Sequence, residues 1–284
     1  MVLESLIGVK YAEKRPIHVF LLGFLYATVA VFLGLWIFRS ESSMILVFLT
    51  VMASIPLVYA TLKFEAERDI KDRKEVKILK GHYYGVRVLI FLFLGYVAAL
   101  VVWYLTLPAD LVLDLFSTQI STIQAINGNL TSGNATSWTF LSAIIGNNLK
   151  VLFFCVFFSF FYGAGAIFIL TWNASVISAA IGSFIRDRIG VYASAVGLAK
   201  VAGYMHVLSF GLLRYMTHGI FEIIAYFIGG MAGGLISLGV LNYKMGNENF
   251  KIIMRDAVNL VIIAMLVIIA AGLIEVYVTP LMFS

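Results

Sequence analysis

Cysteine and charged residues are both scarce in this sequence. Cys155 is the single cysteine among 284 residues, so the chain can form no internal disulfide and no thiolate metal site. Charged residues make up 12% of the chain, against about 25% in a typical soluble domain, whereas hydrophobic residues make up 62% and the mean hydropathy is +0.99. This composition excludes an ordinary soluble domain and a disordered chain, and it predicts a polytopic membrane protein.

Motifs of the common enzyme and nucleic-acid-binding classes are also absent from the sequence. No Walker or dinucleotide fingerprint occurs, the zinc-protease pattern is missing, and basic residues are not interleaved with aromatic residues on a polar surface. No nucleophile stands beside a base. We therefore expect a non-enzymatic protein without a cofactor, and we expect no nucleic acid among its partners.

Apolar stretches of about 20 residues, the length that spans a bilayer as a helix, recur along the chain. They predict an all-α bundle of seven transmembrane helices, at 17–38, 44–62, 88–107, 149–172, 189–213, 219–241 and 257–277. The 189–213 segment contains Lys200 and His206, which are unfavourable at mid-membrane unless they face protein or water. Six crossings plus a re-entrant or interfacial segment at 189–213 is therefore the alternative.

Basic residues are distributed unevenly between the connecting segments. Residues 63–87 contain eight of the 20 Lys and Arg residues, whereas 108–148 contains none. Because basic loops stay on the cytoplasmic side, we expect 63–87 to be a cytoplasmic charged helix and 108–148 to be an external loop of a multi-pass cell-membrane protein. The 108–148 loop also contains glycosylation sequons at Asn129 and Asn134. Seven crossings place the C-terminus outside.

Small residues recur every four positions in the 219–241 helix. The row consists of Ala225, Gly229, Gly233 and Ser237. Small side chains allow the backbones of two membrane helices to approach closely. The row therefore predicts a tight helix contact, either within the chain or between the copies of a homo-oligomer.

Three ionisable residues form a candidate ligand or ion site. His218 and Glu222 are four residues apart, a spacing that places both side chains on one helix face. Glu275 is expected at the same side of the membrane and at a similar depth, because the last two helices run in opposite directions. A structural polar knot, an ion or proton site, and hydrolytic chemistry are the three interpretations, in that order. Whether the cluster holds a metal is left open, because a third ligand is not assured.

Several short stretches resemble the stage II sporulation protein M family of integral membrane proteins. They are Asn147-Asn148-Leu149-Lys150-Val151, Gly163 and Gly165 with Asn173 after Trp172, His218-Gly219-Ile220-Phe221-Glu222 and Leu273-Ile274-Glu275-Val276-Tyr277-Val278-Thr279-Pro280. The resemblance covers about 86–284, so the transmembrane hairpin and charged helix at 1–85 look like an added unit. We expect Asn147, Asn148 and Asn173 to be structural polar residues, with the first two near the candidate site.

The resemblance implies a membrane scaffold or complex subunit, because the family's namesake resembles an organiser of envelope-remodelling partners. The expected partners are the lipid bilayer and other envelope or membrane proteins. The alternative is a small-solute or ion transporter that uses the buried Glu and His side chains, since ionisable residues within membrane helices are candidate functional sites.

Overall fold

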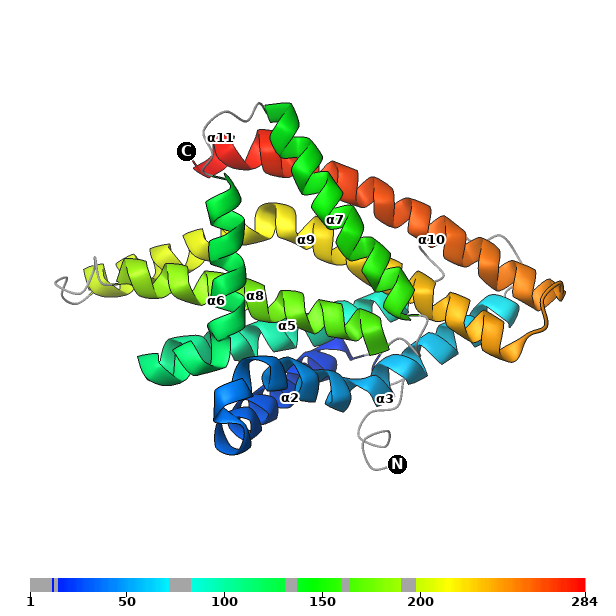
Figure 1. Ribbon diagram of the computed structural model, residues 1–284, viewed down its shortest axis with the longest axis horizontal. Coiled ribbons are helices and arrows are strands. Elements are labelled where there is room, and N and C mark those ends of the chain that lie inside the picture. The colour runs from blue at the N-terminus through cyan, green and yellow to red at the C-terminus, as the bar shows by residue number, and fades with distance from the viewer. Residues whose placement is uncertain are drawn as a thin grey trace.

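The computed structural model describes residue 12 and residues 15–71, 83–130, 137–159, 164–189 and 198–283. Within these residues the secondary structure is helical, without a strand (Figure 1). The elements are α2 (Pro16–Ile37), the 3₁₀ turn η2 (Arg39–Glu41), α3 (Ser42–Lys71), α5 (Tyr83–Thr106), α6 (Ala109–Leu130), α7 (Ser137–Ser159), α8 (Ala164–Ile189), α9 (Leu198–Asn242), α10 (Glu248–Leu273), the π-helical turn η4 (Ile274–Val278) and α11 (Thr279–Phe283). Asn134 and the side chains of Asn129 and His218 lie outside the described part.

Within the described residues, seven helices are long and apolar enough to cross a bilayer, the number that the sequence predicts. The segments are Pro16–Ile37, Arg39–Glu67, Tyr83–Thr106, Trp138–Phe158, Ile167–Arg188, Gly219–Asn242 and Glu248–Leu281. The all-α bundle and the number of seven candidate spans are confirmed, but Trp138–Phe158 and Ile167–Arg188 take the place of the predicted crossings at 149–172 and 189–213. The chain is a multi-pass membrane protein.

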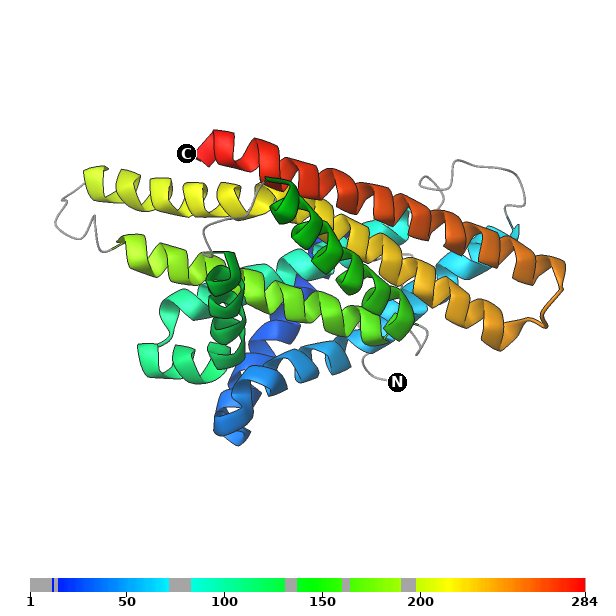
Figure 2. The same ribbon diagram turned by 45° about the horizontal axis from the view of Figure 1, so that its top comes forward.

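The spanning helices alternate in direction along the chain. The turn at Arg39, the ends of α5, α8 and α10, and the beginnings of α7 and α9 lie towards one end of the bundle, which we call the Arg39 end (Figures 1 and 2). We call the opposite end, where α3 finishes and α9 turns into α10, the Lys71 end. Contacts between helices agree with this arrangement: Arg186 of α8 donates to the carbonyl of Leu107, so α5 and α8 finish together.

The predicted helix at 149–172 is wrong in its bounds. One helix, α7, already begins at Ser137 and ends at Ser159, and a second, α8, begins at Ala164 and runs back. The prediction failed because Asn147 and Asn148 lie inside α7 and do not mark the boundary of a helix. Asn173, predicted at the inner end of a helix, lies within α8 and donates from Nδ2 to its own helix at the Ile169 carbonyl, 2.8 Å away.

The predicted external loop at 108–148 is largely helical. It contains α6 and the first half of α7. A kink at Phe116, with φ −120° and ψ 16°, divides α6 into two parts, and after the kink the helix lies across the other helices (Figures 1 and 2). The Phe116 side chain is fully buried, which fixes this bend in the core. The sequence of α6 has no apolar run long enough to indicate a membrane crossing, because only one face of this helix is buried.

The predicted crossing at 189–213 is not a separate helix. Residues from Leu198 onward belong to α9, which continues without interruption to Asn242 over 45 residues. At 1.5 Å per residue this helix is about 67 Å long, roughly twice the hydrocarbon thickness of a bilayer. Gly219, read as the start of a new helix, has no neighbour within 4 Å of an added Cβ and interrupts nothing.

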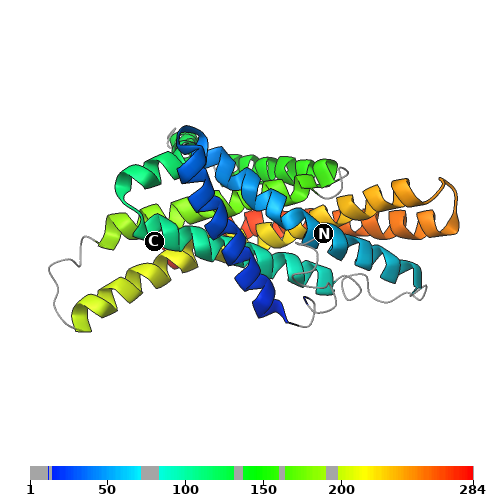
Figure 3. The same ribbon diagram turned by 90° about the horizontal axis from the view of Figure 1, so that it is seen from below.

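The N-terminal hairpin packs directly on the remaining helices. A Cβ on Gly23 of α2 would meet the Leu92 carbonyl oxygen of α5, and a Cβ on Gly95 would meet the Phe20 carbonyl oxygen. The backbones of α2 and α5 therefore touch where α2 crosses the bundle (Figure 3). Both helices contribute to one hydrophobic core. The helices before and after residue 85 therefore pack together without a gap. The division of the chain into two units stays a prediction.

Candidate functional site: an acid pair between three helices

Two carboxyl groups meet inside the bundle. Glu222 belongs to α9 and Glu275 to η4, and their side chains lie within hydrogen-bonding reach of each other. A carboxylate has only acceptors, so a hydrogen bond between two carboxyl groups requires a proton on one of them. The pair can therefore hold one exchangeable proton.

Asn148 of α7 fixes the orientation of Glu222. Its Nδ2 donates to Glu222 Oε1 at 2.5 Å, and its Oδ1 accepts from the hydroxyl of Tyr226 at 2.9 Å. Both Asn148 and Tyr226 are buried. Because the amide donates on one side and accepts on the other, only one orientation of Asn148 satisfies both neighbours. The contacts link α7, α9 and η4 through one chain of hydrogen bonds.

The π-helical turn η4 carries Glu275 at the end of α10. Thr279 Oγ1 donates to the Ile274 carbonyl, five residues earlier, at 3.2 Å, as the wider turn allows. A π-helical turn rotates the residues after it relative to a regular α-helix, and such turns are frequent at functional sites. In a regular α-helix, the Glu275 side chain would point in a different direction from the axis of α10. The local backbone thus sets the position of the second carboxyl group.

The small-residue row supports the same helix contact. Ala225 and Ser237 are buried, and a Cβ on Gly229 would meet Leu152 of α7. All four residues of the row, including Gly233, are buried by other parts of the same chain. A homo-oligomer stays a prediction, and it would need a different face of the protein.

The group can hold a proton, and its oxygen atoms suit a hard cation. Among the described residues, no group of three or more His, Cys, Asp and Glu side chains is placed to hold a metal ion. The side chain of His218, predicted as the third member, lies outside the described side chains. Asn147, also expected near the site, is exposed on α7 and makes no described contact with the pair.

Comparison with known proteins places these residues in a family. The family model for stage II sporulation protein M matches residues 87–280, which include all four members of the hydrogen-bonded group. The chain belongs to the stage II sporulation protein M family. An uncharacterized protein of Methanocaldococcus jannaschii is 28% identical over 141 residues, which cover 49% of this chain and 70% of that relative. No solved structure matches the chain.

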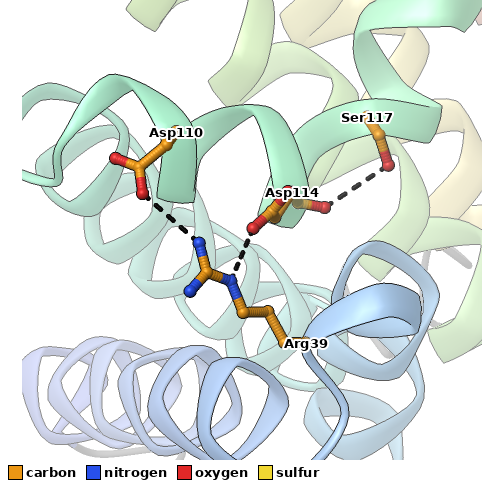
Figure 4. A network of polar contacts seen from close by, with 4 residues as sticks. All are labelled: Arg39, Asp110, Asp114 and Ser117. Carbon is orange, nitrogen blue, oxygen red and sulfur yellow. Dashed lines mark hydrogen bonds and ion pairs between the residues drawn. The ribbon is translucent and has the colours of Figure 1, made fainter.

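The matched family region is tied to the N-terminal hairpin by contacts that sequence reasoning missed. Arg39 of η2 forms ion pairs with Asp114 at 2.8 Å and Asp110 at 3.3 Å, both on α6 (Figure 4). Behind them, Gln119 of α6 accepts from Ser43 Oγ at 2.7 Å and donates to Ser175 Oγ at 3.1 Å. The i,i+4 spacing of the two aspartates was the available signal, since it places them on one helix face.

Glu65 is a second polar residue that sequence reasoning did not single out. It was counted with the charged cytoplasmic segment, yet its side chain is fully buried. Its Oε1 accepts from the backbone N–H of Gly85 at 3.1 Å, in the first turn of α5. A carboxylate at a helix N-terminus satisfies an otherwise unpaired donor and is favoured by the helix dipole. The signal was helical spacing, because Glu65 continues the buried face of Val58 and Leu62.

Proposed function

We propose that this member of the stage II sporulation protein M family is a non-enzymatic membrane scaffold that presents α6 to envelope or membrane proteins. The observation that carries the proposal is the way α6 is held: exposed ion pairs and a buried polar chain both fasten it to the hairpin and to α8. In this proposal the Lys71 end is cytoplasmic and the Arg39 end is external, in keeping with the positive-inside rule.

The free face of α6 has the character of a water-exposed binding surface. After the kink at Phe116, the exposed residues of α6 are polar: Ser117, Ser121 and Gln124. The Ser43–Gln119–Ser175 hydrogen bonds are buried, so they fix the opposite face more firmly than the exposed Arg39 ion pairs do. A helix that is already ordered loses little conformational entropy when a partner binds it.

Site-specific crosslinking in native membranes tests the scaffold proposal. A photoreactive side chain at Ser121, on the exposed face of α6, is compared with one at Met245, which is 81% exposed between α9 and α10. We expect Ser121 to capture a defined polypeptide at near-stoichiometric yield, and Met245 to capture none of that polypeptide. Equal capture at both positions, or none at Ser121, would contradict the proposal.

The second candidate function is transport of a proton or a small cation. The close approach of the Glu222 and Glu275 carboxyl groups favours it, because ionisable groups within membrane helices commonly form proton and ion pathways. Proteoliposomes with an imposed pH gradient and a trapped pH dye provide the test. Transport predicts dissipation that is lost in Glu222→Gln and retained in Glu248→Gln, a change at an exposed carboxylate. A rate no faster than in empty liposomes contradicts transport and leaves the scaffold proposal standing.

A further inference from the structure

A lysine lies on the outer surface of a membrane-spanning helix. Lys150 is within the Trp138–Phe158 span of α7, and its side chain is exposed. No hydrogen bond or ion pair joins it to another residue in the part of the chain that the structure describes. Charged side chains within membrane spans normally pair or face the interior of the bundle. Lys150 does neither, so something outside the chain must satisfy its charge.

The exposed face of α7 changes character along its length. Trp138, near the Arg39 end, is 73% exposed and suits a membrane interface. Further along α7, Asn147 and Lys150 are exposed one turn apart, and the exposed rings of Phe153 and Phe157 come next, stacked with centroids 5.9 Å apart. A polar part of the exposed surface of α7 is thus followed by an apolar part, as a headgroup is followed by acyl chains along a lipid molecule.

Space is available beside the polar residues. A Cβ built on Gly146 meets no atom within 4 Å, so the surface between Asn147 and the preceding turn is open. Side chains on a helix lean towards its N-terminus, which for α7 is the Arg39 end. A lysine at position 150 can therefore reach back along the helix towards Asn147 and Gly146, in the direction in which a long basic side chain reaches the membrane surface.

We propose that Lys150 and Asn147 bind the phosphate group of a membrane phospholipid, whose acyl chains lie against Phe153 and Phe157. The ammonium supplies the positive charge and the Asn147 amide supplies a further donor, while Gly146 leaves room for the headgroup. Charge complementarity selects a phosphate, and the neighbouring phenylalanines select a lipid over a free anion. The Trp138–Phe158 span is suited to this role, because only 22% of its most apolar window is buried inside the bundle, the lowest share of the seven.

Thermal unfolding in detergent with added lipid tests the proposal. The probes are phosphatidylglycerol, monogalactosyldiacylglycerol, which has no phosphate, and inorganic phosphate alone. We expect phosphatidylglycerol to raise the Tm of the unmodified protein by several degrees, and the other two probes to leave it unchanged. Lys150→Gln should lose at least half of the increase, whereas Lys251→Gln, at an exposed lysine of α10, should keep it.

Native mass spectrometry and a charge-conserving variant complete the test. Lys150→Arg should retain a bound phospholipid, and Lys150→Gln should release it, when both have the same Tm without lipid. An undiminished Tm increase in Lys150→Gln, or an equal increase with the phosphate-free lipid or with inorganic phosphate, would overturn the proposal. A polypeptide captured by a photoreactive side chain at Asn147 would also overturn it, because the occupant would then be a protein helix.

Discussion

The carboxyl group of Glu222 on α9 lies within hydrogen-bonding reach of that of Glu275 on η4, and Asn148 of α7 donates to the same Glu222 side chain. Three helices that are distant in sequence thus meet at one carboxyl group. A proton shared between the two groups would remove the repulsion that two ionised carboxylates have at close range. The group is a structural lock in the scaffold proposal and a proton site in the transport proposal.

Two substitutions of Glu222 distinguish the contribution of its hydrogen bonds to stability from that of its ionisable carboxyl group. Glu222→Gln keeps an acceptor for Asn148 and gains a donor for Glu275, so we expect the stability to change by less than about 1 kcal/mol. Glu222→Leu leaves both partners unsatisfied, and we expect a loss of about 2–4 kcal/mol. Thermal unfolding in detergent measures both changes, with Glu248→Leu at an exposed position as the control. Equal losses for the Gln and Leu variants would show that the hydrogen bonds are not important for stability.

The contact between α2 and α5 makes a second prediction. Gly95→Ala places a methyl group against the backbone of α2 at Phe20, so the two helices must separate. Overpacking of this kind costs about 1–3 kcal/mol. Gly219→Ala is the matched control, because its new methyl group meets no atom within 4 Å, and alanine there should be neutral or slightly stabilising. A lower Tm for Gly95→Ala alone is the expected result, and equal Tm values would contradict the close contact.

The sequence predicts those parts of the fold that depend on composition. A bilayer demands long apolar helices, so five of the seven crossings follow directly from the apolar runs. The total of seven agrees because the predicted 149–172 helix is parts of two spans, whereas 189–213 is not a span of its own. Helix ends were harder to predict, because a polar side chain inside the bundle looks the same in sequence as one at a boundary. Asn148 illustrates this: it was read as preceding a helix, but it lies within α7 and is satisfied by Glu222 and Tyr226.

Polar helices beside the spans were not predictable from hydropathy. Most of the exposed side of α6 is polar, and its buried side includes Gln119, so the apolar signal is too weak to mark a helix. The acid pair was partly accessible, since antiparallel helices of similar length place Glu222 and Glu275 at matching depths. Tyr226 was not identified, although it lies one turn after Glu222 on the same face, because its role depends on an amide from another helix.

The side of the membrane on which each end lies is a third prediction. Single cysteines at Ser121 and Met245 in a Cys155→Ser background report it, and the buried Cys155 is replaced by a side chain of similar size. We expect a membrane-impermeant thiol reagent added to intact cells to label Ser121→Cys and to leave Met245→Cys unlabelled. After permeabilisation both should react, which confirms that both are accessible. Labelling of Met245→Cys alone in intact cells would reverse the topology.

The anchoring of α6 makes the last prediction, and it compares the buried and exposed attachments of the same helix. Gln119 accepts from Ser43 Oγ and donates to Ser175 Oγ inside the bundle, so Gln119→Leu leaves two hydroxyl groups without these partners. Arg39→Gln removes ion pairs between exposed side chains, which contribute about 0–1 kcal/mol.

Hydrogen exchange followed by mass spectrometry distinguishes the two variants. We expect Gln119→Leu to increase amide exchange at least several-fold throughout 109–124, because α6 opens locally more often when its buried contacts are lost. Arg39→Gln should change exchange there much less, and neither variant should alter exchange in the buried α9 segment at 223–235. If Arg39→Gln had the larger effect, α6 would depend mainly on its surface charges, and high salt would then release it.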